Sequence, residues 1–248
     1  MIDKIMNQHR FADSFKFENV CDWGKTLVVA PHPDDESLGC GGAIALLRKF
    51  GHEVYVLTMT DGVLSHPNSK KFPASSLRDL REQETLTALN ILNVSAAHVT
   101  FLRLPDRHVP AKNEAGFSIL IKNISSIITK IQPSTVLVPW RRDPHPDHRA
   151  TWEIFKTANI FSNEKYRLLE YPIWLWEMAE AADLPEENEV TLWHLDIAQV
   201  LGQKHQAIYS HASQITNLID DDPEGFRLSA EVLAQFNHPT EIYLEGLQ

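Results

Sequence analysis

The chain has 248 residues, of which 43% are hydrophobic and 23% charged, and its formal net charge at pH 7 is −10. This length can bury a sizeable core, and the acidic balance argues against nucleic acid or an anionic membrane surface as the main partner. No segment approaches the roughly 18 apolar residues of a membrane span. The first 20 residues lack the apolar centre of a signal peptide, so we expect a cytoplasmic protein.

Apolar stretches alternate with amphipathic stretches along the chain. The predicted strands are 27–30, 53–60, 97–104, 134–139, 166–174, 189–195 and 240–245, and the predicted helices are 37–50, 75–92, 117–131, 148–160, 198–211 and 224–236. This alternation is typical of a mostly parallel sheet that is covered on both faces. We therefore predict an α/β, Rossmann-like three-layer αβα fold in which residues 1–248 form a single domain.

Two of these helices carry more specific predictions. Ser75 or Ser76 should cap the helix that runs to about Leu92. In the helix over 117–131, one face should gather the isoleucines Ile119, Ile124, Ile127, Ile128 and Ile131.

Two clusters of histidine and carboxylate follow predicted strands. HPDDE (32–36) follows the strand at 27–30, and DPHPDH (143–148) follows the strand at 134–139. Ligands of such sheets bind beyond the carboxyl ends of the strands, so both clusters should reach one site. Each cluster carries a second potential ligand three residues after its first histidine, and a proline stiffens each turn.

Two imidazoles and one carboxylate that converge on a point form the pattern of a catalytic zinc site with one position open for water. The adjacent negative charges of Asp34 and Asp35 would then be compensated, because one carboxylate binds the dication and the other orients the water on it. The alternative is a pair of polar turns with surface histidines. That alternative is reasonable for one cluster and rare for two at one sheet edge.

The stretch PHPDDESLGCGG, together with the later HPDH, resembles the PIG-L (LmbE-like) family of metal-dependent N-acetylglucosaminyl deacetylases. The two histidine motifs are specific when they occur together. Weaker similarities are LTMTDG (57–62), LREQETLTALNIL (80–92), FLRLPD (101–106) and KHQAIYSHASQ (204–214), so the resemblance covers nearly the whole chain.

The resemblance implies metal ligands at His32, Asp35 and His148. It also implies a general base at Asp34 and a residue that faces the reacting carbonyl at His145, which Asp147 would orient. In the resulting hydrolysis of an acetamide, zinc lowers the pKa of its water to about 7, and Asp34 takes the proton. A protonated His145, whose pKa Asp147 would raise, stabilises the oxyanion together with the metal. The same donor set accepts Fe(II) or Co(II).

Substrate contacts by Arg81, Asp106 and His211 are also implied by the resemblance. From the residues alone, Arg81 could instead pair with Glu84 on a helix surface, and His211 could be a buried histidine that the backbone satisfies. Asp143 stands where some family members carry a tyrosine that assists the oxyanion, so that assistance is absent here or comes from elsewhere.

The residues just before the second cluster have two interpretations. Trp140, Arg141 and Arg142 form either a sugar-stacking indole with a basic rim for phosphate or carboxylate, or a strand end with solvated arginines. The glycines in GCGG (39–42) do not form a dinucleotide loop, because the third required glycine falls on Ile44 and carboxylates precede it. We expect them to let the helix pack closely on the sheet.

The predicted partner is a small acetamido-sugar or glycoconjugate. Two other functions remain open at this point: a metal-dependent amidase or phosphoesterase acting on a different small polar substrate, and a non-catalytic binding protein. Phosphoesterases commonly use two metals and more ligands than these motifs offer. The oligomeric state, a homo-oligomer included, is also left open by the sequence.

Overall fold

A computed structural model describes residues 15–162, 165–186 and 188–247. Its centre is an eight-stranded sheet with the order β1-β7-β8-β6-β5-β2-β3-β4. The strands are β1 (Phe15–Phe17), β2 (Thr26–Ala30), β3 (Val54–Thr60), β4 (Val99–Leu104), β5 (Thr135–Pro139), β6 (Arg167–Tyr171), β7 (Val190–Asp196) and β8 (Thr240–Gly246). Strand β8 runs antiparallel to β6 and β7, and the other strand pairs are parallel.

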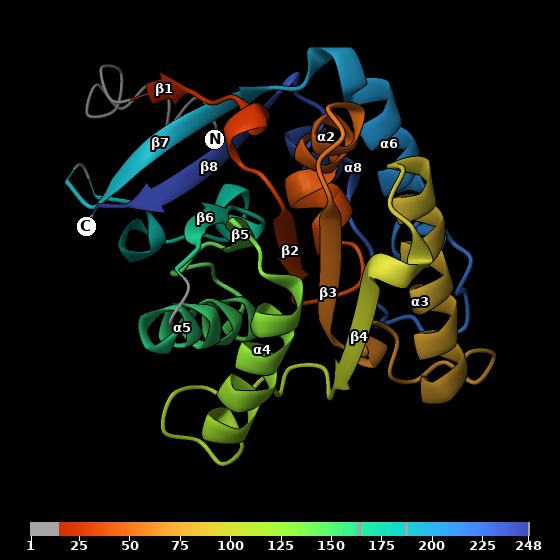
Figure 1. The fold of residues 1–248 in the computed structure, drawn as a ribbon. Helices are drawn as coiled ribbons and strands as arrows, with labels where there is room; N and C mark the ends of the chain where they lie inside the picture. The colour runs from red at the N-terminus through yellow and green to blue at the C-terminus, as the bar shows by residue number, and fades with distance from the viewer. Residues whose placement is uncertain (1–14, 163–164, 187, 248) are drawn as a thin grey trace.

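Helices cover both faces of this sheet (Figure 1). They are α2 (Asp35–Lys49), α3 (Ala74–Ile91), α4 (Phe117–Ile131), α5 (Pro146–Phe161), α6 (Leu201–Tyr209), α7 (Ala212–Ile215) and α8 (Ala230–Gln235). Leu27 and Val29 of β2 pack into the core under α4 and α5, and Val28 packs into the opposite core under α2. Burial on both sides explains the unbroken apolar run of this strand. The predicted α/β, Rossmann-like fold is confirmed, whereas the prediction of a single domain over residues 1–248 stays a prediction.

Several predicted boundaries are wrong by a few residues. Helix α5 begins at Pro146 rather than at residue 148, because His145 caps it and proline suits a first helical turn. Helix α3 begins at Ala74 after Pro73, so neither predicted serine caps it. Ile119 is 67% exposed, since five residues of helix rotate it by about 140° from Ile124.

The side of the sheet on which the chain adds its next strand changes between β4 and β5, so β2 and β5 are neighbours at the switch point. From β2 it adds β3 and β4 on one side, and it then crosses over to add β5 and β6 on the other. The crevice at such a switch point, at the carboxyl ends of the strands, is the usual ligand site of an open α/β sheet. The HPDDE loop leaves β2 there, and the DPHPDH loop leaves β5.

The glycine-rich start of α2 lies close to the sheet, as expected. A Cβ atom added at Gly39 would lie 2.3 Å from Cδ2 of Tyr171 in β6. The Tyr171 hydroxyl donates to the carbonyl oxygen of Val29 at 2.6 Å, which joins β6 to β2 beside this contact. Only glycine permits this approach of helix to sheet. Among the helices of the described residues, none is long and apolar enough to cross a membrane.

Candidate metal centre

The loop after β2 holds Asp34 in a conformation that non-glycine residues rarely adopt, with φ +134° and ψ −27°. Such strain persists only where the surroundings enforce it, and it is often found at functional sites. Here the Asp34 backbone N–H donates to Oε2 of Glu36 at 3.1 Å. Arg81 donates to the carbonyl oxygens of Pro33 at 2.6 Å and Gly62 at 2.7 Å. The loop is therefore clamped from two sides.

The loop after β5 is ordered by the start of α5. The ring Nδ1 of His145 accepts the backbone N–H of Asp147 at 3.2 Å and so caps the helix. The backbone N–H of His145 donates to Oδ1 of Asp143 at 3.0 Å. His148 then lies in the first turn of α5 and is fully buried.

These two loops bring together the three side chains that the sequence proposes as metal ligands. Nδ1 of His32 lies 3.2 Å from Oδ2 of Asp35 and 3.3 Å from Nε2 of His148. Nε2 of His148 lies 3.3 Å from the same carboxylate oxygen. Four-coordinate zinc, with bonds of about 2.0–2.1 Å, separates its ligand atoms by about 3.3 Å. The triangle has the dimensions of one face of a tetrahedral site.

Each of the two histidines has a carboxylate on its other ring nitrogen. Nε2 of His32 lies 3.2 Å from Oδ2 of Asp147 and 3.5 Å from Oδ1 of Asp106. Nδ1 of His148 lies 3.3 Å from Oδ1 of Asp143. A carboxylate behind a histidine is the usual support of a metal ligand, because it fixes the ring and its tautomer. No role was predicted for Asp143, which is fully buried and does not line the cavity.

The charge of this cluster suits a bound cation. Each of the side chains of Asp35, Asp106, Asp143 and Asp147 is at most 7% exposed. Burial alone would lower the pKa of His32, but Asp106, Asp147 and Asp35 raise it well above its ordinary value. Burial would also lower the pKa of His148, which Asp35 and Asp143 raise to about 9. The carboxylates that favour a proton on each imidazole also favour a divalent cation between the two rings.

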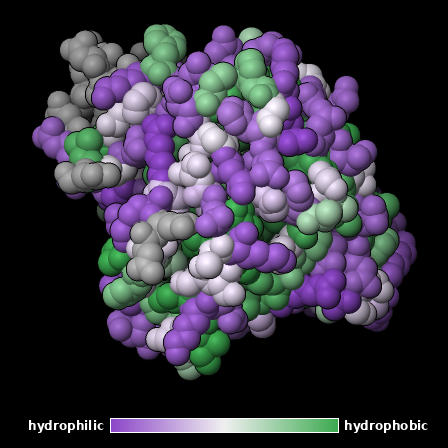
Figure 2. All heavy atoms as spheres, viewed as in Figure 1, coloured by the Kyte–Doolittle hydropathy of each residue, from purple (hydrophilic) through white to green (hydrophobic). Residues whose placement is uncertain are grey.

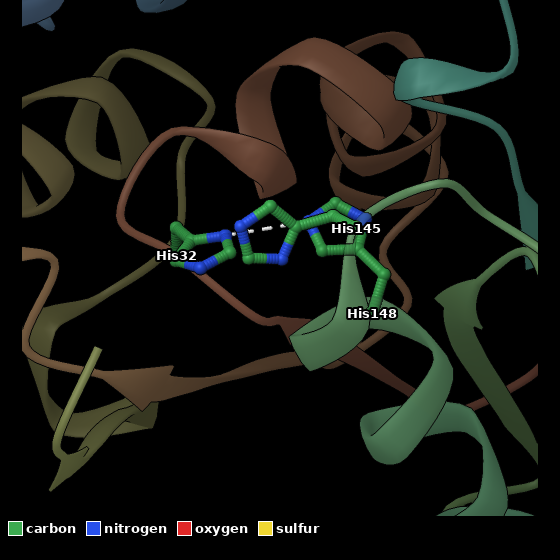
Figure 3. A group of neighbouring side chains, drawn as sticks. All are labelled: His32, His145 and His148. Carbon is green, nitrogen blue, oxygen red and sulfur yellow. Dashed lines mark hydrogen bonds between the residues drawn. The ribbon is translucent and has the colours of Figure 1, made fainter. Parts of the chain in front are cut away.

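Two other groups of side chains could hold an ion. His32, His145 and His148 each offer a ligand atom within 4.8 Å of the others, and Figure 3 shows their rings gathered at the ends of the two loops. The second group comprises His32, Asp106 and Asp147. In His145, however, Nδ1 is already occupied by the Asp147 N–H, which leaves this residue less suited to ligation.

The predicted partnership of Asp147 with His145 is wrong in its details. The Asp147 carboxylate accepts from the backbone N–H groups of Arg107 and Val109 and contacts the ring of His32, not that of His145. Two residues apart at a helix start, the two side chains do not face each other. Burial and the charges of His32 and His148 lower the pKa of His145 to about 4, where a raised value was expected.

Asp34 has the environment of a general base. Its side chain is 9% exposed and lies 3.2 Å from Nη2 of Arg81. Burial raises the pKa of Asp34 to about 7, although the Arg81 charge opposes the rise. A carboxylate with a pKa near neutrality is well matched to proton transfer at neutral pH.

The three predicted substrate-binding residues have different surroundings. Asp106 and Arg81 both line the cavity, but the Arg81 donors are held by the HPDDE loop and Gly62. His211 does not line the cavity, and its predicted substrate contact stays a prediction. Its Nε2 lies 3.1 Å from Oε1 of Glu36, the residue that binds the Asp34 backbone. The alternative pairing of Arg81 with Glu84 is replaced by hydrogen bonds that the backbone N–H and the hydroxyl of Ser213 donate to the Glu84 carboxylate.

Of the two interpretations of the residues before the second cluster, the sugar-stacking indole with a basic rim does not fit the structure. Trp140 is fully buried, and its Nε1 donates to the carbonyl oxygen of Asp183 at 2.7 Å. Arg141 pairs with Glu170 and Arg142 with Glu189. Both guanidinium groups are therefore engaged within the protein.

A cavity of about 370 Å³ opens beside His32, Asp34 and Asp35. Six apolar residues of its lining come from the same few segments, and we call them the apolar wall: Leu38, Trp174, Met178, Phe226, Leu228 and Val232. Polar side chains of Glu177, Arg227 and Ser229 line the cavity beside them. The wall residues carried no signal in the sequence, because they come from separate segments without a motif.

Comparison with known proteins agrees with this fold. Residues 27–159, more than half of the chain, match the family described as PIG-L, GlcNAc-PI de-N-acetylase, so the chain belongs to this family. The similarity extends to a probable N-acetyl-alpha-D-glucosaminyl L-malate deacetylase 2 of Bacillus subtilis, at 28% identity over 88% of this chain and 95% of that protein. A diacetylchitobiose deacetylase of Thermococcus kodakarensis is 34% identical over 52% of this chain but only 46% of its own length.

A solved structure supports the fold, and one relative is named for a reaction other than deacetylation. The N,N'-diacetylchitobiose deacetylase from Pyrococcus horikoshii superimposes with a TM-score of 0.70 at 23% identity, over 98% of this chain and 92% of that one. A 4-oxalmesaconate hydratase of Pseudomonas putida is 26% identical over 76% of this chain and 73% of that protein. The family thus includes proteins named as hydratases as well as deacetylases.

Proposed function

We propose that the protein is a metal-dependent N-deacetylase that hydrolyses the acetamide of an N-acetylglucosamine-type sugar or glycoconjugate. The observation that carries this proposal is the triangle of His32 Nδ1, Asp35 Oδ2 and His148 Nε2, with sides of 3.2–3.3 Å, beside the buried carboxylate of Asp34. Family membership and the deacetylase relatives support the same chemistry.

In this proposal His32, Asp35 and His148 hold the metal, with zinc as the first candidate and Fe(II) or Co(II) as alternatives. When bound, the ion supplies a Lewis acid that polarises the amide carbonyl and acidifies the attacking water. Asp147 and Asp106 fix the ring of His32, and Asp143 fixes the ring of His148.

Asp34 takes a proton from the attacking water at its carboxylate, and it can return a proton to the amine that leaves. His145 accepts at Nδ1 from the Asp147 backbone, so its neutral tautomer carries the hydrogen on Nε2. That N–H can donate to the oxygen of the tetrahedral intermediate without a charged imidazole. Glu36 and His211 are positioning residues. Glu36 accepts the backbone N–H of the strained Asp34, and His211 contacts the other oxygen of the Glu36 carboxylate.

A mass-spectrometric screen tests this function. The zinc-loaded protein is incubated with N-acetylglucosaminides that carry varied aglycones, and the loss of one acetyl group together with release of free acetate supports the proposal. Because a hydratase is among the relatives, unsaturated dicarboxylic and tricarboxylic acids are included. A gain of one water on those acids, without acetate release from any sugar, would replace deacetylation by hydration.

A further inference from the structure

The apolar wall of the cavity has no role in the deacetylation step proposed above. Its inner members Leu38, Leu228 and Val232 are 2%, 5% and 7% exposed, whereas Phe226 and Met178 are 39% and 58% exposed. Leu38 lies three residues after Asp35 on the same helix. The wall therefore extends from the candidate metal centre to solvent.

Backbone hydrogen bonds hold the wall in place before any ligand binds. The N–H of Trp174 donates to Oδ2 of Asp143 at 3.0 Å, and the other oxygen of that carboxylate supports His148. The N–H of Phe226 donates to the carbonyl oxygen of Ser65 at 2.7 Å. The rings of Trp174 and Phe226 make an edge contact with centroids 5.8 Å apart. A preorganised surface binds its ligand at a smaller entropic cost.

The chemistry of the wall does not suit sugar hydroxyl groups. A hydroxyl that leaves water without a new hydrogen-bond partner is penalised, and the wall offers apolar side chains and ring faces. Exposed apolar side chains grouped on a concave surface are instead typical of a site for an apolar ligand group. The volume of about 370 Å³ lies within the range of about 300–1,000 Å³ that is usual for small-molecule sites.

We propose, on the basis of the proposed deacetylase function, that the substrate carries an apolar group of the size of a phenyl ring or a short alkyl chain, which packs on Trp174, Met178 and Phe226. The group belongs either to the aglycone or to the N-acyl chain. Burying it removes apolar surface from water, and on this basis the apolar substrate gains on the order of 10- to 100-fold in kcat/KM over its methyl counterpart.

Two series of substrates test this proposal with the zinc-loaded full-length protein. One series holds the acetyl group constant and compares methyl, phenyl and octyl N-acetylglucosaminides. The other holds the methyl aglycone constant and compares N-acetyl with N-hexanoyl glucosaminide. An advantage of at least about 10-fold in either series supports the proposal and identifies the source of the apolar group. Values within twofold throughout both series would overturn it.

Variants of two wall residues test whether the apolar wall causes the advantage of the apolar substrates over the methyl substrate. Phe226→Ala and Met178→Ala should each lose several-fold of the advantage, measured as the ratio of kcat/KM for the apolar substrate to kcat/KM for the methyl substrate, and Phe161→Ala should keep that ratio. Phe161→Ala is the matched control, because this phenylalanine is 77% exposed and lies at the end of α5, outside the cavity. An advantage that survives both wall variants would contradict the proposal.

Binding measurements separate this inference from the proposed function. Calorimetric titration of Asp34→Asn with the three glycosides reports on the wall without turnover, and tighter binding of the phenyl and octyl compounds is expected. If no compound is deacetylated while this order of affinity persists, the proposed function fails and the apolar site stands. Deacetylation of all compounds at equal rates and with equal affinities would leave the function intact and overturn the apolar site.

Discussion

The charged end of the cavity and its apolar wall are built in different ways. The charged end comes from the two histidine loops and from Asp106 after β4, and each ring or carboxylate there contacts at least one other polar group at 2.7–3.5 Å. The wall comes from three separate segments held by a few backbone hydrogen bonds and by packing. Loss of one group at the charged end should therefore disable the site, whereas loss at the wall should change affinity by degrees.

The largest effect is expected for His148→Ala. Removing one of three ligands should abolish stoichiometric metal binding and with it all turnover, which metal analysis after dialysis and an acetate assay can measure. His238→Ala is the control, because His238 is exposed and far in sequence from both loops. A normal metal content in His148→Ala would exclude this residue as a ligand.

Asp34→Asn should separate metal binding from catalysis. The amide keeps the size of the carboxylate but cannot take a proton, so kcat should fall by about 10²- to 10⁴-fold with the metal content unchanged. If the metal content falls instead, Asp34 is a ligand and the roles of Asp34 and Asp35 are exchanged.

Asp143→Asn should have an intermediate effect on the metal. Loss of the charge behind His148 should weaken metal affinity by about 10- to 100-fold, measured by competition with a chelator. Saturating zinc should restore most of the activity. An unchanged affinity would mean that Asp143 only orders the loop, through its bonds to His145 and Trp174.

Added zinc should also stabilise the folded protein. An ion that binds only the folded state at 1,000 times its dissociation constant contributes about 4 kcal/mol to the free energy of unfolding. Thermal unfolding with and without zinc should show this gain in the wild type and not in His148→Ala. An equal rise in both would indicate binding elsewhere.

The smallest effect concerns stability within the wall. Met178→Ser removes an exposed side chain and should change the free energy of unfolding by less than about 0.5 kcal/mol. Leu38→Ala, at 2% exposure, should cost about 2–5 kcal/mol. Urea unfolding of both variants measures the difference, and equal losses would show that the outer wall is part of the core.

The fold and the charged end could be predicted because their signals are local. Apolar runs gave the strands, and two histidine loops after β2 and β5 meet wherever these strands are neighbours, as they are here. Contacts between the loops could not be predicted. The side chain of Asp147 turns to His32 rather than to His145, and Asp143 takes up a position behind His148.

The apolar wall could not be predicted from the sequence, because it also depends on contacts between distant segments. Phe226 and Leu228 lie within the region predicted as a helix over 224–236, but α8 spans only Ala230–Gln235. The chain ahead of it is extended along the cavity and binds the backbone of Ser65 and Gln214. Contacts between segments so distant in the chain leave no periodic pattern.

Anomalous X-ray diffraction at the zinc edge, from crystals of the zinc-loaded protein, tests the central claim most directly. We predict a single strong peak about 2.0–2.2 Å from Nδ1 of His32, Oδ2 of Asp35 and Nε2 of His148. A peak on the other side of the His32 ring, between Nε2 and the carboxylates of Asp106 and Asp147, would contradict the account.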